Sequence, residues 1–415
     1  MKKFFSFVLI VLGAAALVLA IALPTYVVPK GKVLPLNAVS TTGTDPIESN
    51  LLDSAALGAN KVLPEHANKA ECRGDKPQIS CFIGTGTPLQ SQRFTVAQEP
   101  SDDKQVTLEV GNTLFRTDRD EPRNLLSATI DRITLDRETQ MPIDEAVSTL
   151  DLQPTMPGSE GATEQSNTPG ESFTSANEPF TRPGIQYQFP MGTDRKSYPY
   201  FDNHVLTTKD IDFVEQIEMD GEEVYHFKQT VEPTEVYPNL RNMLEADGEL
   251  SKSDEASLAS LRLKFPAEQW GLSKDEIRNA PAAEKKDENK PEGEEETLPD
   301  VEMSRFYTVN RNIFVQPDTG VIVDGHEEIW MYYAQDQEEA NEIAQPENRK
   351  EEMANPERTA TYFPAKWNQS AKDGQMEKAK EGLKSIHTMG TVVPWILGIV
   401  GVIFLILGFL LYRRP

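Results

Sequence analysis

Two uninterrupted apolar stretches, one near each end of the chain, constrain this sequence more than any other feature. The first, FFSFVLIVLGAAALVLAIAL, runs from Phe4 to Leu23 and contains no charged residue. The second, VVPWILGIVGVIFLILGFLLY, runs from Val392 to Tyr412. Each is as long as the roughly 20 apolar residues that a helix needs to cross a bilayer. The sequence therefore predicts transmembrane helices over residues 4–23 and 392–412.

The basic residues that flank these stretches predict the orientation of the chain. Lysines precede the first stretch, and arginines follow the second. Since positively charged flanks stay preferentially in the cytoplasm, we expect both tips (1–3 and 413–415) there, residues 24–391 outside, and the chain in the plasma (inner) membrane. A cleaved signal peptide is the alternative for the first stretch, but its apolar region usually spans only roughly 7–15 residues.

Small residues recur in both apolar stretches. Gly13 precedes a run of alanines in the first, and Gly398, Gly401 and Gly408 lie in the second. Because small side chains let transmembrane helices approach closely, we expect the two helices to pack on each other or on the helices of a membrane partner.

The net charge of −25 over 415 residues restricts the possible partners. A chain this acidic repels a phosphate backbone, so nucleic acid is excluded as a partner. Much of the acid lies in segments that are rich in Pro, Gly and Ser or in charge, and such segments cannot bury enough surface to become ordered. We expect three poorly ordered inserts, at about 152–184, 280–300 and 335–358.

Alternating apolar and polar residues between the two stretches predict strands. Asp220-Gly221 separates two such runs and is typical of a type I′ hairpin turn. The patterns suggest only two helices, at 251–265 and 371–387. We therefore expect a mainly β (α+β) extracytoplasmic domain of antiparallel hairpins, forming a twisted sheet, a sandwich or a half-barrel, flanked by N- and C-terminal transmembrane helices. The predicted strands lie at 106–115, 128–135, 185–189, 211–219, 222–230, 305–316 and 321–334.

The chain has two cysteines, Cys72 and Cys81, which would close a small loop. Disulfides form in oxidising compartments outside the cytoplasm, so the expected topology predicts a bridge between them. Two free thiols are the alternative.

The stretch FVQPDTGVIVDGHEE at 314–328 contains Asp-Thr-Gly, the tripeptide that carries the catalytic carboxylate of aspartic proteases. Such a protease needs two carboxylates that share a proton, and no second copy of the motif is present. A turn explains the residues better: Pro317 presets φ, Asp318 bonds its own backbone, and Gly320 adopts positive φ. We expect a hairpin turn here.

The same stretch continues with Asp324, His326 and Glu328, which are possible metal ligands or proton carriers. In a strand these three share one face, and we expect it to face solvent while Val321, Val323, Ile329, Met331 and Tyr333 occupy the other. The other histidines are scattered, and no nucleophile elbow, phosphate-binding loop or dinucleotide motif is present. The sequence therefore predicts no catalytic, metal or cofactor site. An enzyme that uses Asp324 or Glu328 remains the alternative.

Aromatic residues concentrate in YPYFD at 198–202 and EIWMYY at 328–333. They could line an apolar pocket for acyl chains or a glycolipid, or they could be ordinary core. The candidate residues are Tyr198, Tyr200, Phe201, Trp330, Tyr332 and Tyr333.

Four features together resemble one family of actinobacterial membrane proteins, catalogued as a domain of unknown function (DUF3068) and labelled "porin PorA family". They are the first apolar stretch, YPYFD, VEQIEMDGEEVYHFKQTVEP at 214–233, and RFYTVNRNIFVQPDTGVIVDGHEEIW at 305–330 ahead of the second apolar stretch. The last motif is the most specific, and the acidic inserts resemble a corynebacterial version.

The resemblance implies a role in building an envelope that contains mycolate and lipoglycan. Members are associated with lipomannan and lipoarabinomannan maturation and with transport of trehalose monomycolate. The expectation is a non-enzymatic accessory protein that binds an envelope glycolipid or acyl chain, or a partner such as an inner-membrane mycolate transporter or lipoglycan glycosyltransferase. An enzyme acting on a lipid-linked glycan is one alternative. A porin-like channel is the other, which the sequence disfavours because membrane barrels need many strands of roughly ten residues with alternating lipid-facing positions.

Overall fold

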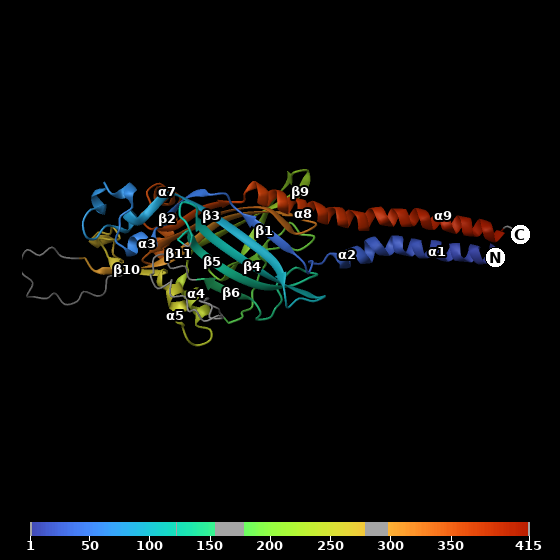
Figure 1. The fold of residues 1–415 in the computed structure, drawn as a ribbon, viewed down its shortest axis with the longest axis horizontal. Coiled ribbons are helices and arrows are strands. Elements are labelled where there is room, and N and C mark those ends of the chain that lie inside the picture. The colour runs from blue at the N-terminus through green and yellow to red at the C-terminus, as the bar shows by residue number, and fades with distance from the viewer. Residues whose placement is uncertain (1, 122, 154–177, 279–297, 414–415) are drawn as a thin grey trace, which may run out of the picture.

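The computed structural model describes residues 2–121, 123–153, 178–278 and 298–413, so most of the inserts expected at 152–184 and 280–300 lies outside the described residues. A sheet domain occupies one end of the molecule, and a pair of long helices extends from it (Figure 1). The two ends of the chain lie next to each other at the far tip of this pair (Figure 1). The first and last parts of the sequence are therefore neighbours in space.

The helix pair consists of α1 (Lys2–Ala22) and α9 (Val393–Arg413). The continuous helical segments that contain them, Lys3–Gly31 with 29 residues and Gln369–Arg413 with 45, are long and apolar enough to cross a membrane. Short π-helical segments, η1 (Leu23–Val27) and η7 (Thr388–Val392), lie within these segments.

Small residues form the contact between α1 and α9. A Cβ atom added to Gly13 would lie 2.8 Å from the carbonyl oxygen of Gly401, and the Ser6 hydroxyl donates to the carbonyl oxygen of Gly408 at 2.6 Å. The two backbones approach this closely only because Gly13, Gly401 and Gly408 carry no side chain. The expectation that the two helices pack on each other is confirmed.

This contact gives a prediction about the helix pair. A Cβ at position 401 would lie 2.9 Å from Leu17 Cγ, whereas one at Gly398 meets nothing within 4 Å. We expect Gly401→Leu to separate α1 from α9 and Gly398→Leu to leave them paired. Spin labels at Phe5→Cys and Phe409→Cys measure this by electron–electron resonance in detergent. Equal distance distributions in the two variants would refute this account of the contact.

Within the described residues, thirteen strands form one antiparallel sheet, which confirms the predicted fold class. Its order is β6-β5-β4-β3-β2-β13-β12-β11-β9-β8-β7, with β1 on β3 and β10 on β11. The strands are β1 (Val39–Gly43), β2 (Ile47–Leu52), β3 (Ile83–Gln98), β4 (Gln105–Arg116), β5 (Leu125–Asp136), β6 (Thr149–Gln153), β7 (Tyr198–Asp202), β8 (Thr207–Met219), β9 (Glu222–Glu235), β10 (Arg262–Pro266), β11 (Asp300–Gln316), β12 (Val321–Ala334) and β13 (Thr359–Lys366).

The remaining helices are short, apart from α8. The short helix α2 continues α1 toward the sheet, and the others lie around the sheet (Figure 1). The predicted helix at 251–265 is divided between α5 and β10, and the one at 371–387 corresponds to α8. The α-helices are α2 (Val28–Gly31), α3 (Ser54–Gly58), α4 (Tyr237–Leu244), α5 (Lys252–Ala259), α6 (Gln337–Ile343), α7 (Pro346–Ala354) and α8 (Gln369–His387). The 3₁₀ turns are η2 (Pro64–His66), η3 (Ala70–Cys72), η4 (Ile79–Phe82) and η6 (Lys274–Glu276).

The β8–β9 hairpin turns at Asp220-Gly221. Both residues have positive φ, 51° and 82°. A type I′ turn requires this backbone conformation, and its twist matches the twist of the two strands.

The segment expected to be a poorly ordered insert at 335–358 is ordered, and that prediction was wrong. The Asp336 side chain accepts a hydrogen bond from the Glu339 amide and caps α6, and Pro346 occupies the first turn of α7. A proline in the first turn of a helix costs nothing, because the amide that it lacks would be unpaired there. Ala340 and Met353 pack against the apolar cluster around Trp330.

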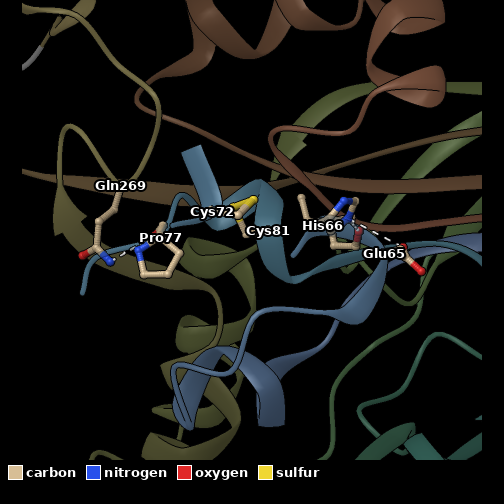
Figure 2. Close-up of a disulfide and its surroundings, with 7 residues drawn as sticks. Glu65, His66, Cys72, Pro77, Cys81 and Gln269 are labelled. Atoms are coloured by element: carbon tan, nitrogen blue, oxygen red, sulfur yellow. Dashed lines mark hydrogen bonds and ion pairs between the residues drawn. A yellow bond between two sulfur atoms is a disulfide. The ribbon is translucent and has the colours of Figure 1, made fainter. Parts of the chain in front are cut away.

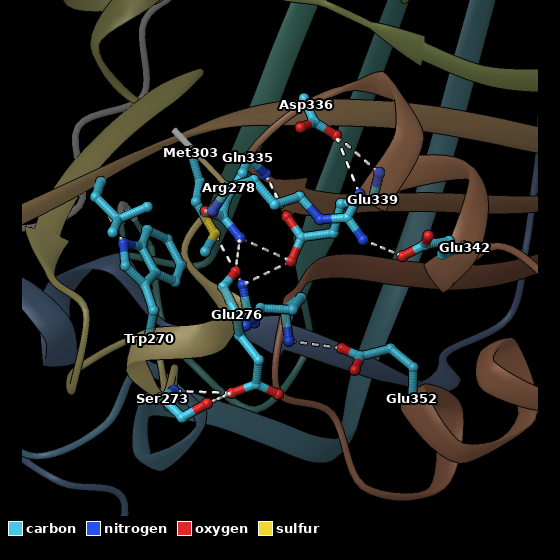
Figure 3. Close-up of polar contacts among 12 residues, drawn as sticks. Trp270, Ser273, Glu276, Arg278, Met303, Gln335, Asp336, Glu339, Glu342 and Glu352 are labelled. Atoms are coloured by element: carbon cyan, nitrogen blue, oxygen red, sulfur yellow. Dashed lines mark hydrogen bonds and ion pairs between the residues drawn. The ribbon is translucent and has the colours of Figure 1, made fainter. Parts of the chain in front are cut away.

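A buried polar cluster fastens α6 and α7 to the sheet (Figure 3). Glu352 accepts hydrogen bonds from the amides of Arg358 and Thr359, at 2.7 Å each, and from the Thr359 hydroxyl at 2.9 Å. Burial raises the pKa of Glu352 above its usual value, although these donors oppose the shift. The Arg358 side chain lies 3.8 Å from Glu339 of α6, and its amide donates to Glu352 of α7. This one residue, directly before β13, therefore contacts both helices.

Cys72 and Cys81 form a disulfide (Figure 2). Both are buried in a core cluster with Phe82 and Trp270. The Ile79 amide donates to the Gln269 carbonyl at 2.7 Å, which ties the disulfide loop to the segment after β10.

Candidate functional site

The concave face of the sheet surrounds a cavity of about 660 Å³. Leu150 of β6 and Tyr200 of β7 both line it, although these strands are the two ends of the sheet order. The sheet therefore curls until its first and last strands face the same space. Such curling follows from the right-handed twist that each strand adds to its neighbour.

Residues 178–193, which we call the closing segment, lie between the two edge strands. Phe180 bridges to Ser148 next to β6, and Ile185 bridges to Tyr200 in β7. The strand predicted at 185–189 is therefore absent apart from this one bridge. The alternation in IQYQF reflects an irregular segment whose side chains pack inward at both ends, since Ile185 and Phe189 are fully buried.

A buried aspartate of β5 holds the closing segment. Asp131 accepts hydrogen bonds from both terminal nitrogens of Arg182, at 3.0 Å and 2.5 Å, and from the Tyr187 hydroxyl. Asn203, just after β7, donates to the same carboxylate at 2.8 Å. The Arg182 and Asp131 side chains are both 0% exposed, so this ion pair is shielded from water. One carboxylate thus joins β5, the closing segment and the end of β7.

A second buried charge group forms part of the cavity wall. Arg311 of β11 pairs with Asp202 at 3.0 Å and with Glu327 of β12, and the Tyr307 hydroxyl donates to Asp202 at 2.9 Å. Burial has the largest single effect and would raise the pKa of Asp202, but Arg311 and His204 together outweigh it, so the pKa lies below its usual value. The pKa of Glu327 is lowered in the same way. Both carboxylates are therefore ionised at neutral pH.

The aromatic residues predicted to form a pocket are not brought together. Of the six, Tyr200 lines the cavity. Side chains alternate between the faces of a strand, so Trp330 and Tyr332 lie on the opposite face from Tyr333. The first two pack under α6, and Tyr333 packs on Trp270.

The other two predicted aromatics also lie outside the cavity lining. Tyr198 packs edge-on against Phe189 and Phe227. Phe201 packs against Phe180 and under the Arg182 guanidinium. The predicted acyl-chain pocket is therefore ordinary core at most of its positions. The polar residues that do line the cavity carry no local motif from which sequence could have found them.

Pro317, Asp318 and Gly320 form the turn between β11 and β12. Gly320 has a φ of 68°, and a Cβ atom there would overlap the carbonyl oxygen of Phe189 in the closing segment. The Thr319 amide donates to the Gln316 side chain at 2.9 Å, so Gln316, not Asp318 as expected, supplies the side-chain acceptor. The turn also receives the closing segment, since the Gly192 and Thr193 amides donate to the Pro317 carbonyl.

The expectation that Asp324, His326 and Glu328 form one solvent-exposed face was wrong for the first of them. Asp324 is 4% exposed and lies 3.4 Å from both His326 and Lys372 of α8, which covers this end of the strand. The pairing of β11 with β12 is irregular after Phe314, and Val323 consequently packs toward α8 as well. Glu328 is exposed and pairs with Arg349. In the part of the chain that the structure describes, no three His, Cys, Asp or Glu side chains are grouped to hold a metal ion.

The fold and the site define a class: a protein with two apolar terminal helices and a curled antiparallel sheet around a charged cavity. The chain belongs to the Porin PorA family, which it matches over residues 5–410. It is 59% identical over 411 residues to a protein named Porin PorA from Corynebacterium resistens, covering 98% of this chain and 96% of that one. It is 40% identical over 416 residues to a Porin PorA from Corynebacterium amycolatum, covering 99% and 98%. The predicted family is confirmed.

These names contradict the function and the membrane expected from sequence. Relatives named as porins support the alternative of a channel, not an accessory protein of lipoglycan, mycolate or trehalose monomycolate metabolism that binds lipid. A porin is a channel of an outer membrane, so the placement in the inner membrane with both termini in the cytoplasm is overturned as well. Basic flanks orient helices during insertion into a membrane, but they do not say which membrane a protein finally occupies.

Proposed function

We propose that this protein is a non-enzymatic channel of the porin type that passes small polar solutes. The cavity inside the curled sheet carries this proposal, because its wall presents charged and polar groups such as Arg311, Glu327 and Asn112. An ordinary hydrophobic core would place apolar side chains at these positions instead. The names of the relatives agree with this reading.

The helix pair is the part of this channel that contacts lipid. Exposed large apolar side chains concentrate on α1, η1 and α9 among the described residues, with a few outside such as Phe94 and Val214. A strand barrel that faced lipid would need a continuous apolar band. Because α1 and α9 pack directly on each other, a single pair leaves no channel between its helices. A pore therefore requires several copies of the pair, with the cavities at its entrance.

Planar-bilayer recording of the full-length protein tests the proposal. We expect discrete conductance steps that scale with the amount of protein added. The same preparation carrying Gly401→Leu should lose them, since that substitution separates α1 from α9. A protein-free detergent preparation is the control. Membranes that contain the protein and yet show no steps would refute the channel.

A further inference from the structure

The cavity is positively charged although the chain as a whole carries −25. Its lining contains six arginines and three carboxylates, and burial lowers the pKa of the lining His204, which is therefore neutral at pH 7. The arginines are Arg93, Arg116, Arg119, Arg123, Arg305 and Arg311, and the carboxylates are Asp53, Asp202 and Glu327. A cation excess enclosed in an acidic protein attracts anions to one place and repels them elsewhere.

Half of these arginines already have carboxylate partners. Arg311 pairs with Asp202 and Glu327, as described above. Arg116 and Arg119 share Asp53, and Arg116 also pairs with Asp118 at 2.7 Å. These pairs use up the three carboxylates of the lining.

The other three arginines form no salt bridge with a described residue, although the charge of Arg93 helps to lower the pKa of Glu327. Within residues 2–121, 123–153, 178–278 and 298–413, no carboxylate lies within 4.0 Å of Arg93, Arg123 or Arg305. The Nε atom of Arg305 is buried and has no hydrogen-bond partner there. Arg123 is exposed, and Arg305 donates to the Tyr333 hydroxyl. The half-buried Arg93 guanidinium has no carboxylate at salt-bridge distance among the described residues, which costs free energy that a bound anion would reduce.

Arg93 is held in an orientation that suits a ligand. Its Nε donates to the Asn112 side chain at 2.8 Å, and its guanidinium lies over the Tyr187 ring, 5.3 Å from the ring centre. These two contacts fix the plane of the group. They leave its two terminal nitrogens for a ligand in the cavity, and paired N–H donors of this kind match the two oxygens of a carboxylate or phosphate.

We propose that the cavity binds a small oxyanion, a carboxylate or a phosphate, through the terminal nitrogens of Arg93. This deepens the proposed function, since the admitted solute would be anionic. Passage of the anion rests on the proposed channel function, whereas binding of the anion does not require a conducting pore. An anion of the size of citrate fits easily within about 660 Å³.

Calorimetric titration of the full-length protein in detergent, at low ionic strength, tests the site with citrate and with inorganic phosphate as separate probes. We expect saturable binding of at least one of them, and the tighter probe tells whether carboxylate or phosphate is preferred. Arg93→Gln should raise its Kd on the order of tenfold or more, the loss expected for one charge-assisted hydrogen-bond pair. Arg93→Lys keeps the charge but not the paired donors, so its Kd should lie between that of the unmodified protein and that of Arg93→Gln.

Arg241→Gln is the matched control, because Arg241 is an exposed arginine of α4 that pairs with the C-cap residue Glu245 and is absent from the cavity lining. It should leave the Kd unchanged. Circular dichroism of each variant verifies that it is folded, and Arg93→Lys provides a second variant if Arg93→Gln is not. No binding of either anion, or equal Kd values in the Arg93 and Arg241 variants, would overturn the site. Binding without conductance would refute the channel and leave the anion site standing.

Discussion

An Asp131→Ala variant is expected to lose roughly 3–5 kcal/mol of its free energy of unfolding, the usual cost of removing one partner of a buried ion pair. The substitution leaves the Arg182 guanidinium, which is shielded from water, with no counter-charge. It also removes the acceptor of Tyr187 and Asn203, so the closing segment loses its attachment to β5. Urea unfolding of the full-length protein in detergent, followed by circular dichroism, measures the loss.

Two further variants distinguish the buried charge from a general effect of removing an aspartate. Asp210→Ala, at an exposed position of β8, should change the free energy of unfolding by less than about 0.5 kcal/mol. The double variant Asp131→Ala, Arg182→Met should recover much of the loss, because neither charge then remains buried. A single variant as stable as the Asp210 control would show that the ion pair does not hold the closing segment.

Gly320→Ala is expected to cost roughly 2–5 kcal/mol, from two sources of strain. Positive φ costs a residue with a Cβ atom about 1–2 kcal/mol, and Gly320 has a φ of 68°. The added Cβ also overlaps the Phe189 carbonyl oxygen, and overpacking adds roughly 1–3 kcal/mol. Thermal unfolding of the variant measures the combined effect, and hydrogen exchange at the Phe189 amide, which donates to Gly320 at 3.1 Å, reports its location.

Gly221→Ala separates these two sources. Gly221 also has positive φ, 82°, but a Cβ there meets nothing within 4 Å. It should therefore show the backbone cost alone and lose less stability than Gly320→Ala. Equal losses of stability in the two variants would mean that the closing segment moves away from the added Cβ at no cost, and that its contact with the turn is not tight.

The local elements of this fold could be predicted because their signals are local. A continuous apolar run specifies a long helix, and Asp220-Gly221 specifies a tight hairpin, whatever the rest of the chain does. The cavity could not be predicted in this way. It depends on how Asp131 of β5 meets Arg182 of the closing segment and Asn203 after β7, 51 and 72 residues away in sequence, and no single stretch records those contacts.

Two sequence predictions failed for different physical reasons. Aromatic residues that are neighbours in sequence, such as Tyr332 and Tyr333, were candidates for one pocket beside the alternative of ordinary core, although alternation along a strand places them on opposite faces. The segment 335–358 was treated as an insert because it is polar and interrupted by Pro346 and Pro356, yet its few apolar residues suffice to cover Trp330. That second outcome depends on which apolar surface α6 and α7 cover, and no local pattern reveals it.

The function was misjudged for a different reason. The family resemblance was correct, but the lipid-related roles attached to it had no support in any residue of this chain. The channel was disfavoured because the sequence lacks the strand pattern of a barrel that faces lipid. The described outer positions of this sheet are in fact largely polar or covered by helices. That pattern bears on a barrel embedded in lipid and not on a channel whose lipid contact is helical.

The long C-terminal helix joins the α1–α9 pair to the sheet. The segment Gln369–Arg413 is a single helix of 45 residues, so α8 and α9 turn and shift together. Its sheet-bound half touches both long hairpins at their tips: Lys380 donates to the Asp220 carbonyl at 3.0 Å, and Gly382 packs on Thr319. In the proposed channel, where α9 lies in lipid, tilting of this helix would shift the turn at Thr319 and Gly320, on which the closing segment packs. Membrane thickness, which sets the tilt of such helices, would then act on how tightly the sheet is closed.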